Sequence, residues 1–152
     1  MPDVFISYSI HDEKLARFVK DHLDHQNLDV FLASISLEPG QKWTPQIFQA
    51  LKDSEWVFLL ASQNAMKSNN VQQEMGAALI SGKKIVPIMW DVEPSQLPIW
   101  VSQYQGLCLQ GHSMESIQSQ VASLSAKVKA DKVRGMWVAG AMLAGLFFVL
   151  SK

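Results

Sequence analysis

Short β-rich runs alternate with amphipathic helical segments along most of the chain, and this order constrains the fold more than any other feature. The predicted strands are 4–7, 29–33, 56–61, 84–90 and 106–109, and the predicted helices are 12–25, 45–53, 68–80 and 114–129. The run WVFLLA at 56–61 is apolar throughout, as expected of a strand covered on both faces. Alternating strands and helices favour a flavodoxin-like, doubly wound α/β fold, with a parallel five-stranded sheet and helices on both faces.

A doubly wound sheet also predicts where a ligand would bind. In such sheets ligands lie outside the carboxyl ends of the strands, at the switch point between the first and third strands of the chain. The segments expected to reach this edge are 8–12, 35–43 and 62–74.

Composition limits the chain to one globular domain and few kinds of site. The 152 residues suffice for one domain, and 48% hydrophobic residues exclude disorder. The single Cys108 excludes a disulfide framework and a multi-cysteine metal site. A net charge of −1 argues against nucleic-acid binding by a general basic field, so no nucleic-acid partner is expected.

The C-terminal region differs in character from the rest. Residues 127–152 hold five basic residues against one acidic residue, and 135–151 carry no charge. A 17-residue helix spans about 26 Å, slightly less than the roughly 30 Å hydrocarbon core of a bilayer. Arg134 and Lys152 can reach the two interfaces, and Trp137 suits the headgroup layer. We therefore expect a transmembrane helix at 135–151, although a helix buried in the domain or in an oligomer is the alternative.

The charges around this stretch predict an orientation in the membrane. The basic segment 127–134 would form a juxtamembrane neck, and the positive-inside rule places domain 1–126 in the cytoplasm. Residues 1–3 lead directly into a strand-like run, so no cleavable signal peptide is expected. The prediction is a single-pass, tail-anchored protein that has the lipid bilayer as a partner.

Several common chemistries find no support in the sequence. No GxGxxG follows the first strand and no GxxxxGK[ST] occurs, which removes the usual dinucleotide and nucleotide loops. A receiver domain would need an aspartate where Ala61 and Ser62 end the third strand. His22 and His25 lie three apart without a partnering cysteine or glutamate, so no metal site and no bound cofactor are expected. Glu74 lies near the start of the predicted helix 68–80, which begins at the ligand edge, and is followed by small and apolar residues. It is either a functional group or a solvated helix residue.

Five segments together resemble the TIR (Toll/interleukin-1 receptor) family, in the form of a stand-alone prokaryotic-type domain. The matching segments are 3–9 (DVFISYS), 31–40, 43–54, 68–77 and 85–88 (IVPI). Each is weak alone, but their order and spacing are specific. The resemblance implies a domain that assembles with other TIR domains or cleaves NAD⁺ at the nicotinamide–ribose bond, with NAD⁺ as substrate rather than cofactor.

The resemblance also assigns roles to residues. It makes Glu74 the catalytic carboxylate, and it makes residues 37–40 the BB loop, which joins neighbouring TIR domains. The expected substrate-binding residues are Ser7, Tyr8, Ser9, Trp43 and Asn70; the residues of the BB loop are Leu37, Glu38, Pro39 and Gly40. Trp43 would stack on a base of the substrate, or it anchors the following helix. Many members have an aromatic residue where this chain has Asn70, four residues before the glutamate.

These observations favour a membrane-anchored effector that cleaves NAD⁺, by hydrolysis or cyclisation, when its TIR domains self-associate in defence signalling. The alternative is a non-catalytic adaptor that recruits other TIR proteins at the membrane through its BB loop. In a third hypothesis, clustered tails themselves perturb the bilayer.

Overall fold

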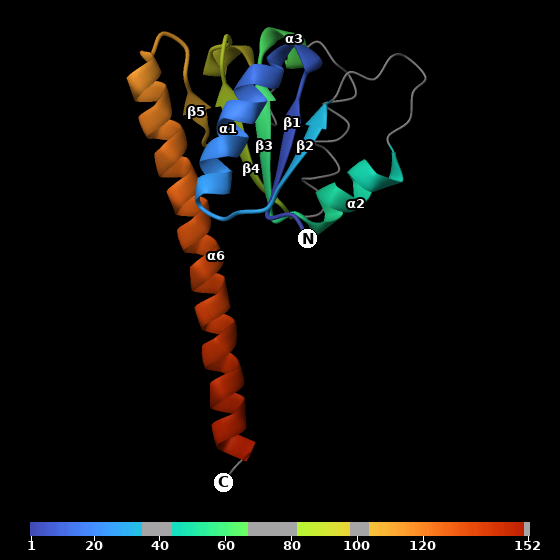
Figure 1. Ribbon diagram of the computed structural model, residues 1–152, viewed down its shortest axis with the longest axis vertical. Helices are drawn as coiled ribbons and strands as arrows, with labels where there is room; N and C mark the ends of the chain where they lie inside the picture. Colours follow the sequence, from blue (N-terminus) through green and yellow to red (C-terminus); the bar gives the residue numbers. More distant parts are fainter. Residues whose placement is uncertain (35–43, 67–81, 98–103, 151–152) are drawn as a thin grey trace.

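The computed structural model describes residues 1–34, 44–66, 82–97 and 104–150, with side chains described as far as residue 136 (Figure 1). Its strands are β1 (Val4–Tyr8), β2 (Val30–Ser34), β3 (Trp56–Ala61), β4 (Lys84–Met89) and β5 (Leu107–Cys108). All neighbours pair in parallel, in the order β2-β1-β3-β4-β5. This is the flavodoxin-like order, so the predicted five-stranded parallel sheet is confirmed.

Helices cover both faces of the sheet (Figure 1). The described helices are α1 (Glu13–His25), α2 (Pro45–Asp53), α3 (Gln63–Met66) and α6 (Met114–Leu150), with short 3-10 helices η1 (Ile10–Asp12) and η2 (Pro94–Gln96). Side chains alternate between the faces of a strand. Ile6 and Phe58 therefore pack with α1 and α6, whereas Phe5 packs with α2 on the opposite face.

Local sequence signals account for most element boundaries. The Thr44 hydroxyl accepts a hydrogen bond from the Ile47 N–H at 3.2 Å, and Pro45 occupies the first turn, so α2 begins and ends as predicted. The first strand runs one residue further than expected, to Tyr8, and a 3-10 turn precedes α1. The predicted helix 68–80 lies entirely outside the described residues.

The last strand, Leu107–Cys108, is shorter than the predicted 106–109, and the residue before it packs closely on β4. A Cβ atom on Gly106 would lie 2.0 Å from the Pro87 carbonyl oxygen, so the backbone of residue 106 rests directly on β4. Only Leu107 and Cys108 then pair with Ile88 and Met89. The predicted fourth strand likewise ends one residue early, at Met89.

The amphipathic pattern predicted that the final helix ends at Lys129, but the helix is longer. It continues as α6 from Met114 to Leu150, because no proline interrupts residues 130–150. Within the part of the chain whose side chains are described, no helix is long and apolar enough to cross a membrane. The predicted span 135–151 lies almost entirely outside that part, and the division into domain, neck and span stays a prediction.

Ion pairs hold α6 against the amino ends of the strands. Lys84, at the start of β4, pairs with Asp131 on α6 and with Glu55 at 3.2 Å. Lys132 pairs with Asp3 at 3.0 Å. These contacts lie where α6 leaves the globular body, at the end opposite the carboxyl ends of the strands (Figure 1). They orient the helix relative to the sheet.

Candidate functional site

The carboxyl ends of β1 and β3 form the edge where the chain changes direction in the sheet. The chain passes from β1 outward to β2, and then returns across β1 to β3 on its other side. Parallel doubly wound sheets bind ligands at this point. The structure therefore places the segments that follow β1, β3 and β4 at the expected site.

A side-chain hydrogen bond joins two of these segments. Ser62, directly after β3 and fully buried, donates a hydrogen bond to the Asp12 carboxylate in η1. The same hydroxyl accepts a 3.0 Å bond from the Ala65 N–H and so caps α3. The loop after β1 is thereby tied to the loop after β3, and these residues are 50 positions apart.

A second link ties the loop after β3 to the loop after β4. Asp91 accepts a hydrogen bond of 2.8 Å from the Gln63 N–H through its Oδ1 atom. The Gln63 side-chain amide also donates to the Asp91 carbonyl oxygen at 3.4 Å. Together with the Asp12–Ser62 bond, this link fixes the relative positions of three loops at the site. Rigid loops of this kind can hold a substrate in a defined orientation.

Tyr8 ends β1 at this edge and is a neutral hydrogen-bonding group. Its side chain is buried and forms a hydrogen bond with the Ser34 hydroxyl at the end of β2. Burial raises the pKa of the Tyr8 phenol, and the nearby charge of Glu13 raises it further. Tyr8 is therefore protonated at neutral pH and can donate a hydrogen bond, but it does not serve as a base.

Two serines flank Tyr8. Ser9 is buried and caps η1, where its hydroxyl accepts a 3.4 Å hydrogen bond from the His11 N–H. Ser7 is 1% exposed, and its hydroxyl has no hydrogen-bond partner among the described residues. Because side chains alternate between the two faces of β1, Ser7 lies on the same face as Phe5, and α2 covers this face. A buried hydroxyl without a partner costs free energy, so Ser7 is a candidate donor to a bound group.

A cavity of about 440 Å³ opens beside this edge, within the size range of small-molecule sites. It is lined by η1, the first turn of α1 and Trp90, whose side chain is 39% exposed. The lining carries Asp12 and Glu13 as well as Lys14. An exposed indole beside both signs of charge offers stacking and ionic contacts to a polar ligand.

The remaining predicted site residues lie outside the described residues. These are the predicted catalytic Glu74, the predicted substrate-binding residues Trp43 and Asn70, and the BB-loop residues Leu37, Glu38, Pro39 and Gly40. Their roles, and those of Ser7, Tyr8 and Ser9 in substrate binding, stay predictions. Among the described residues, no cluster of histidine, cysteine or acidic side chains could hold a metal ion.

Sequence reasoning missed the links between the loops. It named the segments that contain Asp12 and Ser62, but it did not pair these residues, and it left Asp91 in a connecting loop. The available signal was that each residue closely follows a strand, in neighbouring strands of a parallel sheet. The same reasoning applies to Trp90, an aromatic residue directly after β4.

Comparison with known proteins identifies the family. The family model for the TIR domain matches residues 4–124, which is most of the chain. The chain belongs to the TIR family. The match covers every strand of the sheet and the first turns of α6, so the whole site edge belongs to the TIR domain.

One curated relative is named for an enzymatic activity. The TIR chain is 30% identical over 97 residues to a probable 2′ cyclic ADP-D-ribose synthase from Brachypodium distachyon. The match covers 62% of this chain and 43% of the relative, so the chain spans less than half of that protein's length.

Solved TIR structures share the fold at low identity. The TIR domains of the activated Roq1 resistosome superpose with a TM-score of 0.67 at 17% identity, covering 81% of this chain and 98% of that one. The TIR domain of the Toll-related receptor TRR-2 from Hydra magnipapillata superposes with a TM-score of 0.66 at 17% identity. This match covers 85% of this chain and 99% of that one. These likenesses establish the fold of the TIR domain.

Proposed function

We propose that this TIR domain cleaves NAD⁺ at the nicotinamide–ribose bond, and that the product is ADP-ribose or a cyclic ADP-ribose. The observation that carries the proposal is the 30% identity to a relative named as a probable cyclic ADP-ribose synthase. It is supported by the cavity and the buried polar side chains at the carboxyl edge of the sheet. By analogy with the family, we place this activity in defence signalling.

The chemistry suits a site with one essential carboxylate. When the bond from ribose C1′ to the pyridinium nitrogen breaks, the electron pair goes to nitrogen and nicotinamide leaves as a neutral ring. No general acid is needed, unlike in most glycosidases, where a carboxylic acid protonates the leaving oxygen. The ribose becomes oxocarbenium-like, and a carboxylate beside it stabilises the positive charge. We assign this role to Glu74.

The two products differ only in the nucleophile that attacks C1′. Water gives ADP-ribose and releases a proton, whereas a hydroxyl group of the same molecule gives a cyclic product. Tyr8 and Ser7 would hold the substrate from the end of β1, as neutral hydrogen-bonding groups. A site that excludes water favours the intramolecular attack.

The test is NAD⁺ turnover by purified protein, with identification of the products. Glu74→Gln keeps the size of the side chain and removes its charge, and we expect the rate to fall by about 10²-fold or more. Glu115→Gln is the matched control, because Glu115 is an exposed acid at the start of α6, and it should retain the full rate. Equal turnover by the wild type and by Glu74→Gln would refute the assignment.

We further propose that self-association of TIR domains activates the enzyme. This proposal is supported by the solved TIR domains of the Roq1 resistosome, which come from an assembled complex. The specific activity should then rise with protein concentration. Pro39→Ala in the BB loop should lower assembly, whereas Glu74→Gln should leave it intact. A chain that assembles but never consumes NAD⁺ would instead support the non-catalytic adaptor.

We also propose that 135–151 anchors the protein in a membrane, with the TIR domain in the cytoplasm. The support is the uncharged stretch between Arg134 and Lys152, together with the helical backbone of α6 as far as Leu150. In this arrangement the carboxyl edge of the sheet faces away from the bilayer, because α6 leaves the body at the opposite end (Figure 1). Membrane fractionation at alkaline pH tests the proposal. Release of the full chain with peripheral proteins would contradict it.

A further inference from the structure

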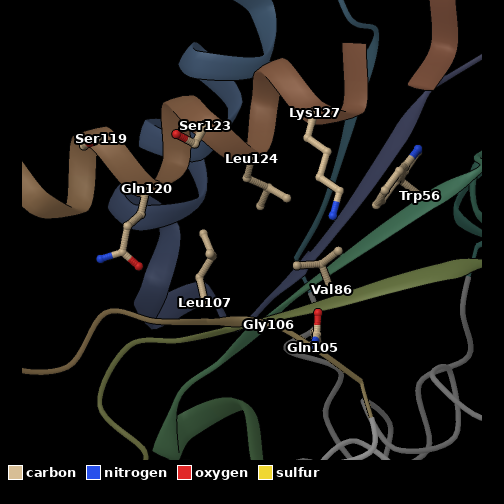
Figure 2. A pocket seen from close by; sticks show the side chains of 10 residues that line it. All are labelled: Trp56, Val86, Gln105, Gly106, Leu107, Ser119, Gln120, Ser123, Leu124 and Lys127. Atoms are coloured by element: carbon tan, nitrogen blue, oxygen red, sulfur yellow. The ribbon is translucent and has the colours of Figure 1, made fainter. Parts of the chain in front are cut away.

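A second cavity lies between α6 and the sheet, apart from the carboxyl edge (Figure 2). It opens beside the start of β3, the middle of β4 and the residues that lead into β5. Its volume is about 380 Å³, within the range of small-molecule sites. None of the described residues that line it belongs to the site described above.

The floor of this cavity is apolar and rigid. Val86, Leu107 and Leu124 converge on it from β4, β5 and α6 (Figure 2). Trp56 closes one end and is held in place, because its ring packs edge-on against Phe58 at 6.5 Å and beneath the Lys84 ammonium at 5.1 Å. Such a floor accommodates a small ring or a short hydrocarbon chain.

Gly106 lines the cavity below Leu107 and Leu124 with backbone alone (Figure 2). Its backbone rests on Pro87, so no side chain projects from this position into the space. A larger residue at this position would collide with the Pro87 backbone in β4.

Two polar side chains of α6, a cation and an amide, lie at opposite ends of the cavity floor. Lys127 is the only charged residue among the described residues that line the cavity, and no ion pair of the described chain involves it. Two turns earlier, the Gln120 amide nitrogen donates to the Ser116 hydroxyl at 3.2 Å. The Gln120 carbonyl oxygen is thereby turned toward the side of Leu107 (Figure 2). The cavity therefore offers a cation at one end and an acceptor at the other.

We propose that this cavity binds a small organic anion that has an apolar ring and a hydrogen-bond donor opposite its charge. The anion would pair with the Lys127 ammonium, the ring would cover Leu124 and Val86, and the donor would bond the Gln120 carbonyl oxygen. An anion is favoured because the described residues of the lining hold a cation without an ion-pair partner and no carboxylate. This inference does not depend on NAD⁺ cleavage.

The probe for the test is 4-hydroxyphenylacetate, which has a carboxylate and a hydroxyl at opposite ends of one ring. Its neutral analogue, 4-hydroxyphenylacetamide, has nearly the same shape without the charge. Titration of the isotope-labelled full chain by amide NMR gives the affinity and the location of binding together. We expect shifts at residues 105–107 and 119–127, and about fivefold tighter binding of the carboxylate than of the amide.

Two variants separate the Lys127 contact from general charge effects. Lys127→Gln should abolish the preference for the carboxylate, and it should fold normally because Lys127 is exposed. Lys129→Gln makes the same change of charge two residues further along α6 and should retain the fivefold preference, since Lys129 does not line the cavity. The proposal would be overturned if the wild type bound the two probes equally, or if both variants lost the preference to the same extent. It would also be overturned if the probe caused no shifts, or caused shifts centred on Trp90 and Met114, away from this cavity.

Discussion

Ser62→Ala is the most informative single substitution at the candidate site, because one hydroxyl makes two contacts there. It donates to the Asp12 carboxylate after β1 and accepts from the Ala65 N–H at the start of α3. Ser62 is completely buried, so water does not replace the lost partners without rearrangement.

The two contacts set the expected loss of stability. Removal of a helix cap costs about 1 kcal/mol. Loss of a hydrogen bond to an ionised carboxylate costs about 2 kcal/mol. The free energy of unfolding should therefore fall by about 3 kcal/mol, and the thermal midpoint of a chain of this size by about 9 °C.

Urea unfolding followed by circular dichroism measures the change, and a double-mutant cycle isolates the link between the loops. Asp12→Ala removes the carboxylate alone and should cost about 2 kcal/mol. The double variant should lose at least 1 kcal/mol less than the sum of the losses in the single variants, because the two side chains share one hydrogen bond. Additive losses, or a Ser62→Ala protein within 0.5 kcal/mol of the wild type, would refute the reasoning.

Three further predictions concern other positions. Gly106→Ala should lower the free energy of unfolding by about 3 kcal/mol because of the collision with the Pro87 backbone, whereas Gly111→Ala, with open space and a φ of +77°, should cost only about 1 kcal/mol in the same urea titration. Thr44→Ala should cost about 1 kcal/mol by uncapping α2, and a change below 0.3 kcal/mol would contradict this role. The raised pKa of Tyr8 predicts a tyrosinate absorbance step above pH 10.0, and Tyr8→Phe should remove that step. Because the folded state keeps this proton to a higher pH than the unfolded state does, stability should decline as pH rises above about 10, and less steeply in Tyr8→Phe.

The order of the strands and helices could be predicted from the sequence because its signals are local. The apolar run of β3 and the Thr44–Pro45 start of α2 each specify an element within a few residues. The end of α6 could not be predicted in this way, because an amphipathic pattern marks only the part of a helix that packs on the body. Beyond residue 129 the pattern fades although the backbone stays helical.

The sequence by itself therefore determined the element order, the parallel α/β class and the edge of the candidate site, since periodicity and capping depend on near neighbours. Only the tertiary structure decided that Ser62 meets Asp12, that Gln63 meets Asp91, and that a cavity remains between α6 and β4. Those partners lie 50 and 28 residues apart. Their contact depends on strand register and on how closely Gly106 lets the chain approach Pro87, which no local pattern encodes.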